Sequence, residues 1–156
     1  MTQITQQEIE ETFESFETFT EADIQKFMRT FQKKQEPLLV YIAAVAERED
    51  LNEEEYDLLI TMVLLTWHLM RLKFPKMKRV TMKQLERLDD LLYEGLASNP
   101  GSMLQEVQNY AQPVLHEAVL TNVMEAEEGV REDRKGIIYF TLKNVMDGMI
   151  HASSAS

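Results

Sequence analysis

The segment from Glu53 to Lys73 constrains the fold of this chain more than any other. Asn52, with Glu55 three residues later, gives it a capping-box start, and Phe74-Pro75 ends it. At about 100° per residue, its apolar side chains spread around well over half of a helical circumference. They are Leu58, Leu59, Met62, Val63, Leu65, Leu69 and Met70. Because such a helix cannot lie on the surface of a monomer, the pattern predicts a largely buried central helix or part of a subunit interface.

The rest of the chain also favours helices over strands. Thr20 and Thr81 have the surroundings of helix N-caps, and apolar residues recur at spacings of three and four after them and after Pro37 and Gly136. Five Gly and four Pro are too few for a loop-rich sandwich. A chain of 156 residues is long enough for one domain to bury its own core. We therefore predict an all-α fold in which residues 1–156 form a single compact bundle of five to seven helices.

The ends of the chain and two prolines leave some helix boundaries open. Residues 1–19 are expected to form a loosely docked N-terminal helix, and residues 151–156 a frayed tail. We favour a break before Pro37, with the proline in the first turn of the next helix. At Pro113, a kinked helix and two separate helices fit the apolar spacing equally well. A charged connection is predicted from residue 125 to near Gly136.

The composition excludes several classes of protein. The chain has no cysteine, which removes disulfide scaffolds, thiol catalysis and Cys-ligated metal sites. The stretch from Met1 to Phe13 carries three acids, no base and no apolar run, unlike a secretory or transit peptide. The longest apolar stretch, Leu58 to Met70, is shorter than the about 20 residues that a membrane-spanning helix needs. We therefore expect a cytoplasmic protein that does not use the membrane as a partner.

The charge of the chain is strongly negative and unevenly distributed. The formal net charge is −11, which repels polyanions and disfavours nucleic acid as a partner. The stretch from Met1 to Ile24 holds seven acids and no base. Between positions 71 and 87, by contrast, a single acid accompanies seven basic residues. This basic patch consists of Arg71, Lys73, Lys76, Lys78, Arg79, Lys83 and Arg87.

The basic patch has three interpretations at this point. It is a binding site for an acidic protein, a nucleic acid or a nucleotide phosphate, or it is a solvated loop whose first cations lie at the C-terminus of a helix. In the third interpretation it lies against the acidic N-terminal segment, because separating opposite charges on a small domain forfeits their attraction.

Two carboxylate pairs offer a hypothesis for a metal site. Each has the spacing E-x-x-D, which places both carboxylates on one face of a helix. The four residues are Glu54, Asp57, Glu86 and Asp89. Over these four residues alone the pattern resembles that of all-α nucleotide pyrophosphatases, and the resemblance implies a Mg²⁺-dependent phosphohydrolase. In a chain with 27 acids, such pairs also arise by coincidence. Neither H-E-x-x-H nor E-x-x-H occurs, so zincin and ferritin-like di-metal sites lack their ligands, and we predict no cofactor. Asp147 and His151 stand four positions apart and could share a ligand.

A polar stripe interrupts the apolar surface of the predicted central helix. It consists of Asp57, Thr61, His68 and Arg71, which fall on one line of the helix. Such a stripe forms either the wall of a polar pocket or a helix edge that faces solvent. The sequence does not distinguish the two.

No motif is specific enough to place the chain in a known family. The function that we predict is a noncatalytic α-helical protein-interaction or regulatory module. We expect it to self-associate as a homodimer, through the central helix or through the apolar stripe that follows Ser102. The first alternative is the Mg²⁺-dependent phosphohydrolase. The second is an acidic regulator whose N-terminal carboxylates mimic a polyanion and occupy a basic site on another protein.

Overall fold

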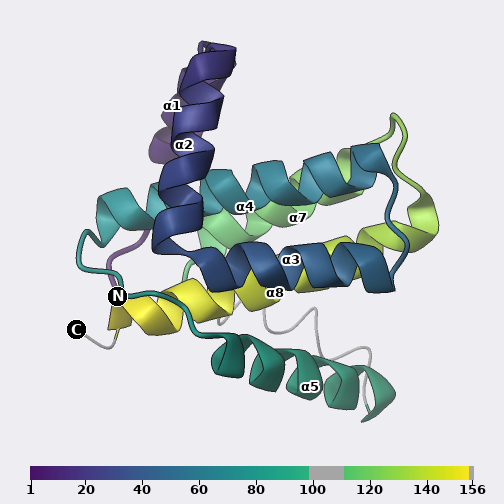
Figure 1. Ribbon diagram of the computed structural model, residues 1–156. Helices are drawn as coiled ribbons and strands as arrows, with labels where there is room; N and C mark the ends of the chain where they lie inside the picture. The colour runs from purple at the N-terminus through teal and green to yellow at the C-terminus, as the bar shows by residue number, and fades with distance from the viewer. Residues whose placement is uncertain (99–110, 155–156) are drawn as a thin grey trace.

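The computed structural model describes residues 1–98 and 111–154, and within these ranges the chain is helical with no strand. Seven helices in these ranges pack together as one bundle (Figure 1). They are α1 (Gln6–Glu17), α2 (Glu21–Lys34), α3 (Glu36–Arg48), α4 (Glu53–Lys73), α5 (Met82–Ser98), α7 (Pro113–Glu125) and α8 (Glu132–Ser154). The all-α bundle predicted from the sequence is confirmed.

Helices α4 and α8 form the centre of the bundle. Helix α4 packs against α1, α3, α7 and α8, whereas α8 packs against α3, α4, α5 and α7. The bounds of α4 are those predicted, and Leu59 and Val63 on this helix are fully buried. Helix α8 is enclosed to a similar degree, with Ile138, Leu142 and Val145 fully buried. Two buried helices, rather than the single one predicted, therefore carry most of the core.

Local capping explains where the helices begin. The side chains of Thr5, Thr20 and Asn52 each accept a hydrogen bond from the backbone of the third helical residue, whose carboxylate accepts one from the cap in return. Before α5, Thr81 Oγ1 accepts a hydrogen bond from Gln84 N at 3.2 Å. Such caps stabilise a helix start by about 0.5 to 2 kcal/mol each. The predicted starts after Thr20, Asn52 and Thr81 are confirmed.

The chain breaks before Pro37, as predicted, and the proline lies in the first turn of α3. Gln35, between α2 and α3, is buried and holds this break in place. Its Nε2 donates to the carbonyl oxygen of Lys78 at 3.1 Å, and its Oε1 accepts from the backbone nitrogen of Val80 at 2.9 Å. The break is thereby joined to the segment that leads into α5.

Pro113 begins α7 rather than kinking a longer helix. The preceding residue, Gln112, is fully buried and binds the N-terminal segment of the chain. Its Oε1 accepts from Ile4 N, and its Nε2 donates to the carbonyl oxygen of Thr2, both at 2.8 Å. Ile4 and Ile9 are also buried, so the N-terminal segment and α1 pack on the rest of the bundle through apolar side chains.

The connection between α7 and α8 is shorter than predicted. Helix α8 starts at Glu132, so Gly136 lies inside the helix instead of ending the loop. Gly129 makes the turn with a φ of +72°, a conformation that favours glycine. Its carbonyl oxygen accepts from Asn52 Nδ2 at 2.9 Å, so this turn packs on the start of α4.

The C-terminal residues do not fray through residue 154, contrary to the sequence prediction. Helix α8 continues to Ser154, and Ala152 and Ser153 are buried. Small side chains here allow close approach of the segment before α5, and Lys78 N donates to the carbonyl oxygen of Ala152 at 3.2 Å. The end of the predicted tail, residues 155–156, lies outside the described residues.

Candidate functional site

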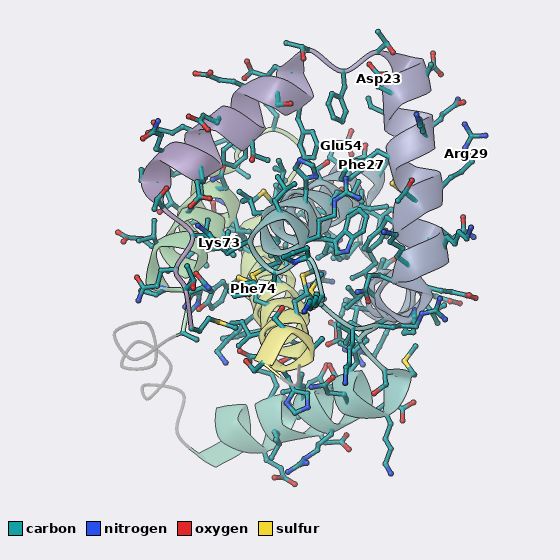
Figure 2. The ribbon with its side chains drawn as sticks, turned by 90° about the vertical axis from the view of Figure 1, so that its left-hand side faces the viewer. Asp23, Phe27, Arg29, Glu54, Lys73 and Phe74 are labelled. Carbon is teal, nitrogen blue, oxygen red and sulfur yellow. The ribbon has the colours of Figure 1, made fainter. Side chains whose placement is uncertain are left out.

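The α1–α2 hairpin stands over one face of α4 and encloses an apolar hollow. In Figure 2 the two helices diverge as arms, with α4 seen end-on between them and Phe27 directed inward. The hollow measures about 180 Å³. We call it the aromatic cleft, and it is lined by Phe16, Phe19, Ile24, Phe27, Thr61 and Leu64.

Three phenylalanines from the two arms build the upper part of the aromatic cleft. The ring of Phe16 lies edge-to-face against those of Phe19 and Phe27, with centroid distances of 4.8 and 5.2 Å. This arrangement is the one that aromatic quadrupoles prefer. Ile24, on the first turn of α2, is 49% exposed at the edge of the cleft. An accessible aliphatic side chain, that of Ile24, therefore lies beside packed phenylalanine rings.

Beneath the cleft, a cation lies among aromatic rings. The guanidinium carbon of Arg71 is 4.2 Å from the ring centroid of Trp67 and 5.1 Å from that of Phe27. The rings of Phe16 and Phe27 also lie 5.5 and 5.4 Å from the His68 ring. These contacts connect the aromatic side chains of both arms to α4.

The Arg71 guanidinium determines the protonation state of His68. Its Nε and Nη2 lie 3.2 and 3.0 Å from His68 Nδ1. A guanidinium can only donate, so Nδ1 accepts and the imidazole is neutral. Partial burial, together with the positive charge of Arg71, lowers the pKa of His68 below its ordinary value.

The four residues of the predicted polar stripe have different neighbours in the structure. Thr61 lies in the floor of the aromatic cleft, and His68 and Arg71 lie against its aromatic side chains. Asp57 is exposed further toward the start of α4, where it lines a separate shallow hollow with Glu54. Part of the stripe is therefore adjacent to a pocket, and part faces solvent.

Helix α1 and the first turn of α2 carry an acidic surface, whereas the rest of α2 carries four exposed cations, Lys26, Arg29, Lys33 and Lys34. In α1 there is no basic residue, and the acids of α1 and of the start of α2 lie mostly in solvent. The exposed ones are Glu10, Glu11, Glu14, Glu17, Glu21 and Asp23. An apolar hollow thus opens beside a group of carboxylates at the tip of the hairpin.

The residues of the predicted basic patch lie in four different places. Lys73 lies toward the N-terminal helix, where its Nζ is 2.9 Å from Glu8 Oε1. Arg71 belongs to the base of the aromatic cleft, and Lys76 is exposed in the loop after α4. The remaining four line a second hollow, which we call the basic groove, between α5 and the end of α8. They are Lys78, Arg79, Lys83 and Arg87.

The four carboxylates of the predicted Mg²⁺ site do not come together. Asp89 accepts hydrogen bonds from Tyr41 Oη at 2.8 Å and Arg48 Nη1 at 3.1 Å, which ties it to α3. Glu86 is exposed on the same helix, whereas Glu54 and Asp57 lie beside the turn between α7 and α8. Among the described residues no group of three or more acids or histidines could hold a metal ion. The facing pairs that the phosphohydrolase alternative needs are not formed, because the two helices present their pairs to different neighbours.

The apolar circumference of α4, which led us to expect a dimer interface, is covered within the chain by α1, α3, α7 and α8. Its buried side chains include Met62, Leu65, Leu69 and Met70. The other expected interface, the stripe after Ser102, falls partly on residues 102–110, which lie outside the described residues. The aromatic cleft was missed from the sequence, although Phe16 and Phe19, three positions apart, gave a signal for it.

Comparisons of the chain with models of known protein families, with curated proteins and with solved structures found no match. Within residues 1–98 and 111–154, none of the helices combines the length and the apolar character needed to span a bilayer. We argue the function of the chain from two of its hollows, the aromatic cleft and the basic groove.

Proposed function

We propose that this chain is a noncatalytic protein-interaction module that binds a basic amphipathic helix in the aromatic cleft. One observation carries the proposal: an apolar hollow lined by three phenylalanine rings and the half-exposed Ile24 opens beside the acidic tip of the hairpin, formed by the end of α1 and the first turn of α2. Helix-in-groove recognition needs these two components, an apolar hollow for the anchoring side chains and a charged surround for orientation.

The size and lining of the cleft favour an inserted side chain over a small-molecule ligand. Its volume of about 180 Å³ is below the about 300 to 1,000 Å³ that is typical of small-molecule pockets. Thr61 is the single polar residue among those that line it. One or two leucine or phenylalanine side chains of a partner helix would fill such a space, and this lining offers no acid or base for catalysis.

The carboxylates around the tip of the hairpin, rather than the whole of both arms, specify the chemistry of the partner, since α2 beyond Asp23 carries exposed cations. Glu14 and Glu17 on α1 and Glu21 on α2 lie in solvent close to the tip of the hairpin, near Phe16 and Phe19 in the chain. Lysine or arginine residues flanking the anchors of a partner helix would meet these carboxylates. An acidic helix would be repelled by them and by the net charge of −11.

A peptide titration tests the proposal. The probe is a fluorescently labelled helix of about 18 residues made of leucine and lysine, with the leucines at helical spacing. We expect Ile24→Ser to weaken its binding about tenfold, because the substitution removes apolar contact without changing charge. Val40→Ser is the matched control, since Val40 is 48% exposed on α3, away from the cleft. Equal affinity of the two variants would contradict the proposal.

Self-association stays a prediction, and a second copy of the chain is an alternative occupant of the same cleft. Sedimentation equilibrium distinguishes the two cases, because a dimer has twice the 18.2 kDa mass of the chain. If a dimer forms and Ile24→Ser returns it to the monomer, then the cleft is a self-association site and the foreign helix is excluded as its main ligand.

A further inference from the structure

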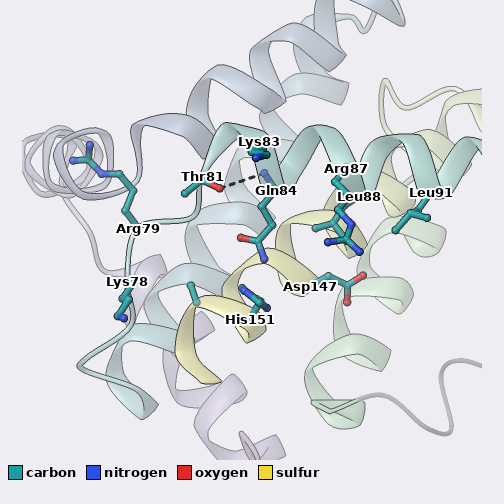
Figure 3. A pocket seen from close by; sticks show the side chains of 11 residues that line it. Lys78, Arg79, Thr81, Lys83, Gln84, Arg87, Leu88, Leu91, Asp147 and His151 are labelled. Carbon is teal, nitrogen blue, oxygen red and sulfur yellow. Dashed lines mark hydrogen bonds between the residues drawn. The ribbon is translucent and has the colours of Figure 1, made fainter. Parts of the chain in front are cut away.

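The basic groove lies on the side of the bundle away from the tip of the α1–α2 hairpin, between α5 and the last turns of α8 (Figures 1 and 3). It measures about 670 Å³, which is within the range of small-molecule pockets. Four of its lining residues are cations, and it also contains the imidazole of His151. The basic groove is thus larger than the aromatic cleft and opposite in charge to the tip of the hairpin that forms the cleft.

Some of the side chains that line the basic groove lie at its centre, and others lie at its margin. In Figure 3, Gln84 and Arg87 from α5 point toward Asp147 and His151 from α8, whereas Lys83 stands at the edge. Asp147 is the one carboxylate among the lining residues, and its Oδ2 lies 3.1 Å from Lys143 Nζ. This ion pair offsets its negative charge, so the groove as a whole remains positive.

Arg79, at the margin of the basic groove, is already hydrogen-bonded to the end of α2. Its Nη2 donates to the carbonyl oxygen of Lys33 at 2.7 Å, and its Nε to that of Lys34 at 3.3 Å. The Oγ1 of Thr81 is likewise occupied as the cap of α5. Arg87, exposed and directed into the groove, is therefore the guanidinium placed to receive a ligand.

We infer that the basic groove binds a small molecule carrying a phosphate group, with Arg87 as the principal contact. A guanidinium presents paired N–H donors that match phosphate oxygens, and Lys83 adds a point charge beside it. Leu88 and Leu91 line the same groove, and Leu91 is 52% exposed, so they offer an apolar surface to the rest of the ligand. This inference is independent of the proposed helix-binding function.

The surroundings favour a small anion over a long polyanion. Glu86 and Asp90 are exposed on α5, the helix that forms one side of the groove, and the chain as a whole is strongly negative. A nucleic acid or heparin chain would extend from the groove onto repelling surface, whereas a single phosphate group would not.

Isothermal titration calorimetry at low salt tests the inference with three probes: inorganic phosphate, phenyl phosphate and heparin. We expect saturable binding of both phosphates, with phenyl phosphate the tighter because its ring contacts Leu88 and Leu91. Arg87→Gln should weaken phenyl phosphate at least about tenfold. Lys26→Gln, which removes an exposed cation on α2, should leave the affinity unchanged.

Three outcomes would overturn the inference. They are absence of binding at about 10 mM phenyl phosphate, equal losses from Arg87→Gln and Lys26→Gln, and heparin binding that is tighter than phenyl phosphate and insensitive to Arg87→Gln. The first shows that no phosphate site exists. The second and third show a general charge effect of the surface. Thermal melts of both variants confirm that the fold is retained, which is expected because both side chains are exposed.

Discussion

The guanidinium carbon of Arg71 lies 4.2 Å from the ring centroid of Trp67, where Phe27 of α2 contacts the same tryptophan on α4. Phe27 contacts the same cation from α2 at 5.1 Å. A cation held between two rings, one from each helix, fixes the position of the α2 arm over α4. The shape of the cleft therefore depends on a residue that does not line it.

Replacing Arg71 by methionine tests this relationship. The side chain keeps most of its length but loses the cation–π contacts and the hydrogen bonds to His68. We expect the free energy of unfolding to fall by about 0.5 to 2 kcal/mol, with a change in the fluorescence of Trp67, the single tryptophan of the chain. A denaturant titration followed by that fluorescence measures both. An unchanged midpoint and spectrum would show that the contact is incidental.

The neutral state of His68 predicts a dependence of stability on pH. Its pKa in the folded chain lies below 6.5, the ordinary value, because of burial and the charge of Arg71. The unfolded chain therefore binds a proton at His68 more readily than the folded chain does. As a result, the free energy of unfolding is unaffected by this group above about pH 6.5 and decreases as the pH falls below that value. Urea midpoints at pH 8 and pH 5.5 should differ in wild type, and the difference should shrink in His68→Gln. A difference of the same size in that variant would assign the effect to other groups.

A second pH dependence, at lower pH, follows from the Glu55–Arg131 pair. Glu55 is fully buried, and its carboxylate accepts from Arg131 Nη2 at 2.8 Å and from Asn52 N at 2.9 Å. The Arg131 guanidinium, with the backbone N–H groups, lowers the pKa of Glu55 to about 2. Its contribution is present above about pH 4.5 and is lost as the pH falls toward 2.

Glu55→Gln isolates this contribution. We expect it to cost about 1 to 3 kcal/mol at pH 7, since charged hydrogen bonds are lost while Arg131 is still partly hydrated. Acid titrations of stability should be flatter in the variant between pH 4.5 and 2. A variant as stable as wild type at pH 7 would mean that the pair does not anchor α4 to the turn before α8.

The two glycines within α8 provide a matched pair of substitutions. A Cβ on Gly148 would lie 2.9 Å from Val80 Cγ1, and Val80 is fully buried with a stiff side chain. Gly148→Ala should therefore destabilise the fold by about 1 to 3 kcal/mol through overpacking. A Cβ on Gly136 would meet no atom within 4 Å, so Gly136→Ala should stabilise the fold by up to about 1 kcal/mol. Thermal melts that rank the variants in the opposite order would contradict this packing.

Local chemistry made most of the fold predictable from sequence. Capping residues such as Thr20 and Asn52 determine their helix starts through contacts that span three positions, so they can be identified without tertiary information. The apolar circumference of α4 likewise needs only helical periodicity. The buried C-terminal turn was not predicted, because Ala152 and Ser153 are enclosed by a distant segment rather than by their own hydrophobicity.

The candidate sites were harder to predict because long-range packing creates them. The aromatic cleft exists only because the α1–α2 hairpin leans over α4, and no local pattern gives that angle. The basic patch is contiguous in sequence, yet the break at Phe74-Pro75 directs Arg71 and Arg87 to opposite parts of the bundle. Sequence identified the cations but not their separate surroundings.

Methyl NMR spectra during a peptide titration test the central proposal most directly. With the leucine–lysine helix, we predict saturable chemical-shift changes in the methyl groups of Ile24 and Leu64, which line the cleft, and little change at Val40. A helix with glutamate in place of each lysine should leave all three unshifted at the same concentration. Shifts that spare Ile24 and Leu64, or equal shifts with both helices, would contradict the assignment of the aromatic cleft as the site for a basic amphipathic helix.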